Sequence, residues 1–145
     1  MSRNRSKRMQ LLYSLAKKNA EAGKGAHADL VSKLTSQQGN LKELVACSEA
    51  QIREMSVMQS RSASALKNSV LFQSDLDTAL QQQRDLILQI EKQIEFQLEK
   101  NSKLYSRQQG IASLQEKFIL EERHEEIRQE AKLLDEFVST RYRAN

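Results

Sequence analysis

Apolar residues recur at helical spacing, without a break, between residues 70 and 99. They follow one another in steps of three, four and seven, and charged residues such as Asp77, Arg84 and Glu91 lie between them. This pattern predicts an amphipathic helix with one apolar seam. The seam is narrow, as in a coiled coil, so it needs a partner helix rather than a thick core. Its members are Leu76, Leu80, Ile87, Ile90, Ile94 and Leu98.

A similar seam earlier in the chain predicts a first helix from about residue 6 to 58. Polar Gln37, Ser48 and Gln51 occupy intervening seam positions in heptad register. Cys47 lies beside this seam, where we expect a small buried apolar side chain rather than a nucleophile. The apolar members are Met9, Tyr13, Ala16, Ala20, Leu30, Leu34, Leu41, Leu44, Met55 and Met58.

Two glycines interrupt the first helix. Gly23 and Gly25 each cost on the order of 1 kcal/mol against alanine in a helix interior, so residues 19–28 form either a weak point or a place of close backbone approach. We favour a locally frayed helix over a functional hinge there.

Residues 59–69 lose the periodicity and are rich in serine, which predicts a turn. Asn68 or Ser69 would cap the second helix, or Ser74 if that helix starts later. The second helix then runs from about 70 to 142. The prediction is an all-α fold, a single elongated domain over 1–145 in which two long helices form an antiparallel coiled-coil hairpin. Beyond residue 99 we expect one seam to continue through Leu104, Ile111, Leu114, Phe118, Ile127, Leu134 and Val138.

The composition agrees with long helices and little deep interior. The 145 residues include no proline and no tryptophan, and only 5% are aromatic, which is too little aromatic bulk for a compact globular domain of this length. Cys47 is the only cysteine, so an intramolecular disulfide is excluded and a reducing compartment is the simpler expectation. No apolar run approaches the roughly 20 residues that span a bilayer, so we expect no direct membrane insertion.

The net charge of +4 is unevenly placed. The chain begins with a basic cluster, whereas residues 116–136 are mainly acidic, and an antiparallel hairpin would bring these segments side by side. The basic cluster of Arg3, Arg5, Lys7 and Arg8 opposes the macrodipole of the helix it precedes. It is therefore either a solubilising tail or a contact for an acidic partner. No aromatic residues are interleaved with these charges, so nucleic acid is not the expected partner.

The sequence offers no constellation that would support catalysis. His27 and His124 are remote from each other, and neither has metal-ligand spacing to Cys47 or to acidic residues. The Gly23-Lys24-Gly25 segment lacks the strand, the spacing and the Ser/Thr of a phosphate-binding loop. We therefore expect no enzyme activity, no catalytic residues, no metal and no cofactor.

Three segments resemble the FliJ family, the stalk proteins of the bacterial flagellar type III export ATPase. Residues 71–84 are similar to the Phe-x-x-x-Leu-x-x-Ala-hydrophobic segment that opens the family's second arm. Residues 133–137, followed by Arg141, resemble its C-terminal ending, and residues 7–12 resemble its basic and hydrophobic opening. Length and the two-arm plan also fit.

The resemblance implies a cytoplasmic antiparallel coiled coil, peripherally associated with the inner-membrane basal body. Its termini would insert into the export ATPase ring, a patch on its arms would bind the cytoplasmic domain of the membrane export gate, and it would escort export chaperones. By position, the gate-binding residues are Phe72, Leu76, Ala79 and Gln83. The expected ATPase-binding residues near the ends are Arg3, Arg5, Lys7, Arg8, Met9, Leu12, Leu134, Phe137 and Arg141.

Several alternatives stay open from the sequence. Leu76 and Ala79 are equally well explained as seam residues, and residues 41–52 lack the tyrosines that often form the first-arm half of the family's patch. A stalk of a virulence type III secretion system or a generic coiled-coil scaffold would share the same pattern. A narrow seam with polar interruptions can be satisfied within one hairpin or between two chains, so the oligomeric state is also open.

Overall fold

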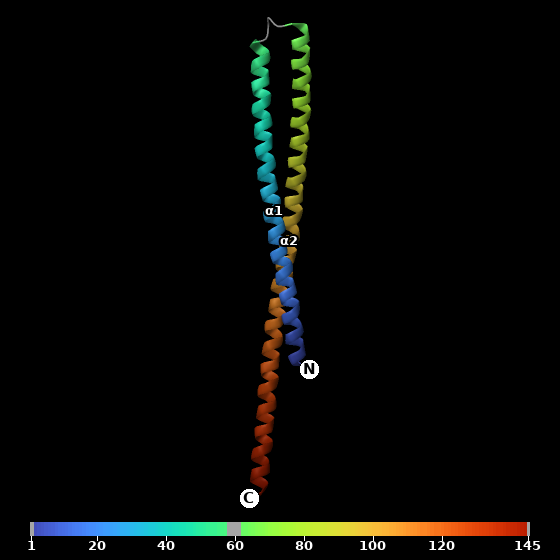
Figure 1. Cartoon of the computed structure of the whole chain (residues 1–145). Helices are drawn as coiled ribbons and strands as arrows, with labels where there is room; N and C mark the ends of the chain where they lie inside the picture. The colour runs from blue at the N-terminus through green and yellow to red at the C-terminus, as the bar shows by residue number, and fades with distance from the viewer. Residues whose placement is uncertain (1, 58–61, 145) are drawn as a thin grey trace. The chain divides into compact units, whose positions relative to one another are not determined.

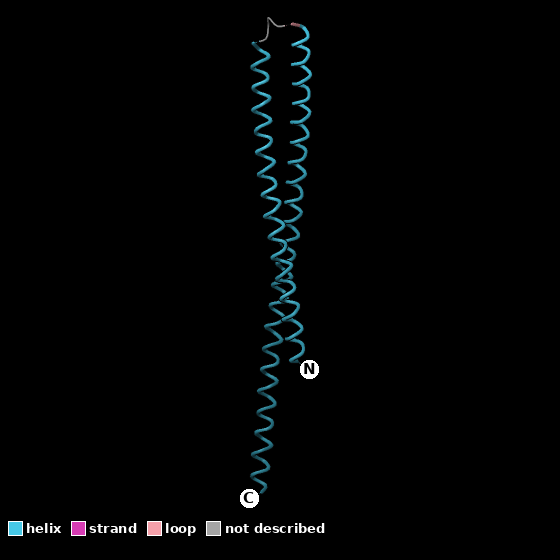
Figure 2. The backbone as a smooth tube through the Cα atoms, viewed as in Figure 1, coloured by secondary structure: helices cyan, strands magenta, loops and turns pink. Residues whose placement is uncertain are grey.

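A computed structural model describes residues 2–57 and 62–144 of the chain, and these form two long helices (Figures 1 and 2). Helix α1 spans Ser2–Val57 and helix α2 spans Ala63–Ala144. The described residues contain no strand, which confirms the predicted all-α class. The two helices pack against each other in antiparallel fashion, as the sequence predicts for a hairpin.

Ser62 caps the N-terminus of α2, in place of the predicted Asn68, Ser69 or Ser74. The Ser62 side-chain Oγ accepts a hydrogen bond from the Ala65 backbone N–H at 3.3 Å, and its carbonyl accepts one from the Leu66 N–H at 3.1 Å. This is the geometry of an N-cap, which satisfies backbone donors that lack a helical partner. Most of the predicted turn is therefore helical, and Ser69 is buried at 7% exposure. Met58 and residues 59–61 lie outside the described residues.

The chain divides into two compact units. Unit 2 comprises Lys24–Lys100, and unit 1 combines Met1–Gly23 with Asn101–Asn145. In each unit, a segment of α1 packs against a segment of α2. The separation falls at Gly23 and at Asn101, although both helices are continuous there.

Unit 2 buries the large aliphatic side chains of the predicted α2 seam. Ile90 is 1% exposed, and Leu76, Leu80 and Ile87 are 7–8% exposed. Polar residues occupy some positions of this seam, as predicted for Gln37, Ser48 and Gln51. Gln83 Nε2 donates to the Gln37 carbonyl at 2.9 Å and to Gln37 Oε1 at 2.7 Å. Gln73 Nε2 donates to Ser48 Oγ at 3.1 Å.

Unit 1 buries small residues most deeply, whereas its large seam residues Leu104, Ile111 and Phe118 are half-buried. Ala16 and Ala20 are 6% and 8% exposed, and Gly23 is also buried. Asn101 Nδ2 donates to the Gly23 carbonyl at 3.0 Å, so the glycine marks a close approach of the two helices. Gly23 and Gly25 both lie within continuous helix, so the expected fraying is not observed.

Four seam predictions are wrong in detail. Leu114 is 42% exposed, because its neighbour Gln115 takes the seam position two heptads after Asn101. Cys47 is exposed, because its neighbour Ser48 occupies the buried position instead. Leu98 is half exposed, because Gln97 takes the seam position that follows Ile90 by one heptad. The seam that was expected to continue through Ile127, Leu134 and Val138 does not do so, because these side chains are 56–63% exposed and lie on another face of α2.

Candidate interaction surfaces

The basic N-terminal arm of α1 packs against the acidic part of α2 within unit 1. The Arg5 guanidinium lies over the Phe118 ring, 5.9 Å from its centroid. Near the same helix end, the Ser6 backbone N–H lies 3.4 Å from Glu122 Oε1. A carboxylate is favoured near a helix N-terminus, where the macrodipole is positive. These contacts place the basic start of α1 beside the acidic part of α2, as the charges of the two segments predict.

The Lys7 and Arg8 side chains of this helix end extend to solvent. Lys7 and Arg8 are exposed, Met9 is half-buried and Leu12 is 43% exposed. Arg3 lies in the first turn of α1, and its side chain is outside those described. This end of α1 therefore presents positive charge together with apolar surface.

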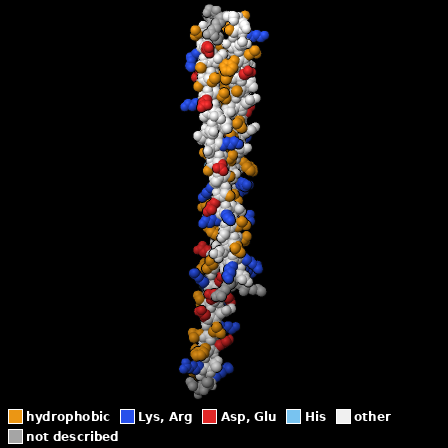
Figure 3. Space-filling model, viewed as in Figure 1, with side chains coloured by type: hydrophobic (Ala, Val, Ile, Leu, Met, Phe, Trp, Pro, Cys, Tyr) orange, Lys and Arg blue, Asp and Glu red, His pale blue; other side chains and the backbone are white. Residues whose placement is uncertain are grey.

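The C-terminal segment of α2 is exposed throughout from Glu126 to Arg143. Leu134 and Phe137 are 62% and 61% exposed, and Arg141 is exposed as well. Figure 3 shows apolar side chains on the visible surface of this end, mixed with charged ones of both signs. Unit 1 thus holds all the residues that the resemblance assigns to ATPase binding, and most of them are accessible.

The four residues assigned to gate binding do not form an open patch. Leu76 is buried at 7% exposure in the core of unit 2, and Gln83 is engaged with Gln37. Ala79 is half-buried, whereas Phe72 is 47% exposed. Val70 and Leu71 are also exposed, at 56% and 55%, but they lie on other faces of α2, because residues one and two positions apart do not face each other on a helix.

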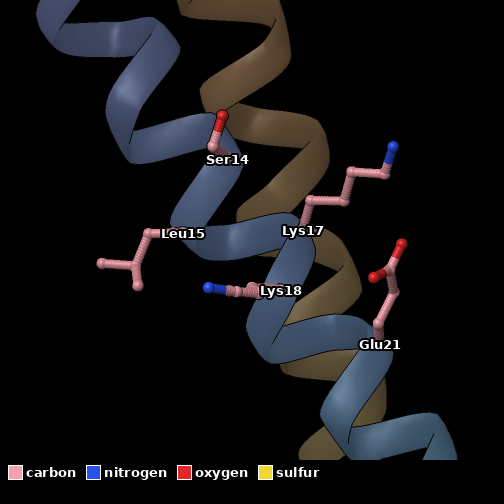
Figure 4. A pocket seen from close by; sticks show the side chains of 5 residues that line it. All are labelled: Ser14, Leu15, Lys17, Lys18 and Glu21. Carbon is pink, nitrogen blue, oxygen red and sulfur yellow. The ribbon is translucent and has the colours of Figure 1, made fainter.

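Two surface depressions among the described residues are wide open, so neither has the enclosure of a small-molecule site. The first is lined by side chains of α1 alone, in unit 1, and Figure 4 shows Lys17 and Glu21 extending to one side of α1 and Leu15 to the other. The second lies in unit 2, beside Leu30 and Phe96. Among residues 2–57 and 62–144, no group of three His, Cys, Asp or Glu side chains could hold a metal ion.

A comparison with protein families identifies the family of the chain that carries these surfaces. A family model described as flagellar FliJ protein matches residues 5–145. The chain belongs to the FliJ family. The match extends over nearly the whole chain, so it covers both units of this FliJ-family protein. Comparisons with curated proteins and with solved structures gave no match.

Membership gives the chain a role associated with flagellar export. FliJ-family proteins are non-catalytic components of that system. In the part of the chain that the structure describes, neither helix has a stretch apolar enough to cross a membrane.

Sequence reasoning missed the contacts that set the shape of the seam in this FliJ-family chain. The Asn101 to Gly23 bond and the Gln83 to Gln37 bonds join residues far apart in the sequence, and each partner alone is a common surface residue. The available signal was strict heptad spacing, since Gln83 lies seven residues before Ile90 and Asn101 seven after Ile94.

Proposed function

We propose that the chain is the stalk of a flagellar export ATPase, with unit 1 as the part that enters the ATPase ring. The observation that supports this most is the collection of exposed basic and apolar side chains in unit 1, where Lys7, Arg8, Leu12, Leu134 and Phe137 are accessible. Complementary charge speeds association and fixes orientation, and exposed aromatic and aliphatic anchors supply affinity.

In this proposal the stalk promotes assembly or activity of the ring and links it to the cytoplasmic domain of the export gate. It also escorts export chaperones and is needed for flagellum assembly and motility. It acts in the cytoplasm, at the membrane-bound basal body. The description of the matching family favours the flagellar system over a virulence secretion system.

Burial narrows the proposed gate contact to the surface around Phe72. A buried Leu76 is not available to a partner unless the hairpin opens, and Gln83 would have to release Gln37. Phe72 offers a half-exposed aromatic ring, which suits an anchor residue at an interface.

The test is the ATP hydrolysis rate of the cognate export ATPase, titrated with the purified chain and with a form lacking residues 1–8. Stimulation or ring assembly by the full chain, reduced by the truncation, is the expected result. No effect on an otherwise competent ATPase would reject the stalk function and leave a generic coiled-coil scaffold.

Charge reversal separates the two proposed contacts without shortening the helix. Lys7→Glu with Arg8→Glu should weaken ATPase binding and spare gate binding, and both residues are exposed, so the seam stays intact. Phe72→Ala should do the reverse, with Leu71→Ala as a neighbouring control of similar exposure. Equal loss of both activities in either variant would argue against separate contacts.

A further inference from the structure

The C-terminal part of α2 carries a second apolar seam, which we call the C-terminal seam. Its members follow one another in steps of seven, four, three and four residues, the 3-4 spacing of a coiled coil. The large members are 50–63% exposed, and the alanine is exposed too. The C-terminal seam consists of Leu120, Ile127, Ala131, Leu134 and Val138.

This seam faces away from the α1 segment of unit 1. Phe118 lies on the face of α2 that contacts α1, as its position beneath Arg5 shows. Ile127 follows Phe118 by nine residues, which is about two and a half helical turns, so it lies on the opposite face. Leu120, two residues after Phe118, lies on that opposite face as well. The helix therefore offers α1 one face and leaves a separate seam for another helix.

The charges beside the seam favour a second copy of this chain as the partner. We propose that two chains pair through their C-terminal seams as an antiparallel coiled coil. In an antiparallel pair, the residues that follow Ile127 and Leu134 flank the same side of the interface. These are Arg128 and Asp135, so each chain would place its Arg128 against Asp135 of the second copy, twice per dimer.

The sizes of the seam side chains also favour the register that pairs Arg128 with Asp135. This register places Ile127 against Val138 of the second copy and Ala131 against Leu134, so that the small alanine meets a large side chain. Shifting one chain by a heptad would oppose Arg128 with its own copy and Glu121 with Asp135. A parallel pair would oppose Arg123 with Arg128 and Glu130 with Asp135. Both alternatives bring like charges together, which is unfavourable.

Within one chain, Arg128 makes a weak ion pair that competes with the proposed contact to Asp135 of the second copy. Arg128 Nη1 lies 3.6 Å from Glu125 Oε2 in an i,i+3 pair, and the two side chains are 78% and 47% exposed. Exposed pairs of this kind contribute little, so the intrachain contact does not hold Arg128 away from a second copy.

The seam is short, so the dimer forms at high protein concentration and dissociates on dilution. Leu134 also belongs to the surface that the proposed function gives to the ATPase, and a seam occupied by a second copy cannot be occupied by the ring. Dimerisation is measured without the ATPase, so its failure and the failure of the proposed function are distinguishable.

The experiment is sedimentation equilibrium of the full chain from about 1 µM to about 1 mM, the range in which a short interface dissociates. Asp135→Arg and Arg128→Asp should each weaken the dimer about tenfold or more, because two attractive contacts become repulsive. An equimolar mixture of the two variants should dimerise as well as the unmodified chain, since every Arg128 and Asp135 contact then regains an opposite charge.

Glu136→Arg is the matched control, because it makes the same change of charge at the next position, on the outer side of the helix. It should leave the dimer unchanged, and circular dichroism should show full helix content in every variant. A chain that stays monomeric over the whole range would overturn the proposal. So would equal weakening by Asp135→Arg and Glu136→Arg, or a mixture no stronger than its components.

Discussion

The two units share the same heptad spacing but bury side chains of different size. In unit 2, the buried apolar side chains are the large ones of Leu76, Leu80, Ile87 and Ile90. In unit 1, the apolar residues buried to the same degree are Ala16 and Ala20, among the described residues, and Asn101 contacts a glycine across the seam. The free energy gained by burial scales with the apolar area removed from water, so the seam of unit 2 should contribute most of the chain's stability. Spacing alone therefore predicts a pairing of helices but not its strength.

The largest expected effect tests the strength of the unit 2 seam. Ile90→Ala should lower the free energy of unfolding by about 2–5 kcal/mol, because Ile90 is 1% exposed and its truncation leaves a cavity. Urea unfolding followed by circular dichroism gives this value. Leu88→Ala, at a residue that is 53% exposed, should stay within about 0.5 kcal/mol. Similar losses in both variants would mean that the aliphatic seam does not dominate.

The glycine pair in α1 tests the close approach in unit 1. A Cβ added at Gly23 would meet Asn101 Oδ1, and it would lie 3.2 Å from Asn101 Cγ and 3.3 Å from Leu104 Cδ1. Gly23→Ala should therefore displace Asn101, break its bond to the Gly23 carbonyl and destabilise the chain by about 1 kcal/mol. This value is the net effect, because the steric overlap and the lost bond together cost more than the roughly 0.5–1 kcal/mol of helix propensity that alanine adds.

Gly25→Ala is the matched substitution with the opposite expected sign. A Cβ at Gly25 meets nothing within 4 Å, so the variant should gain about 0.5–1 kcal/mol from helix propensity alone. The two urea midpoints should move in opposite directions. If Gly23→Ala also stabilised the chain, the close approach would not limit unit 1.

The sequence predicts the all-α class, the pairing of the helices and most of the seam, because heptad spacing is a local property of the chain. It mislocates the N-cap because Ser62, Asn68, Ser69 and Ser74 are all acceptable caps in isolation, and only the tertiary contacts decide among them. It also predicts that one seam continues through Ile127, whereas the apolar residues move to another face of α2 there. The burial of Leu76 within a candidate binding patch could not be predicted, since an apolar residue at seam spacing fits either role.

The smallest effect concerns the one aromatic contact between the arms that the described part of unit 1 shows. Arg5 lies 5.9 Å from the Phe118 centroid, near the outer limit of a cation–π interaction, so the pair should contribute about 0.5 kcal/mol. A single substitution of Arg5 would also relieve the unfavourable position of a cation at a helix N-terminus. A double-mutant cycle with Arg5→Gln and Phe118→Leu removes that contribution and isolates the coupling. A coupling energy of zero would mean that the Arg5–Phe118 contact does not stabilise unit 1. The packing of unit 1 would then depend on its seam residues alone, and its difference in stability from unit 2 would be larger.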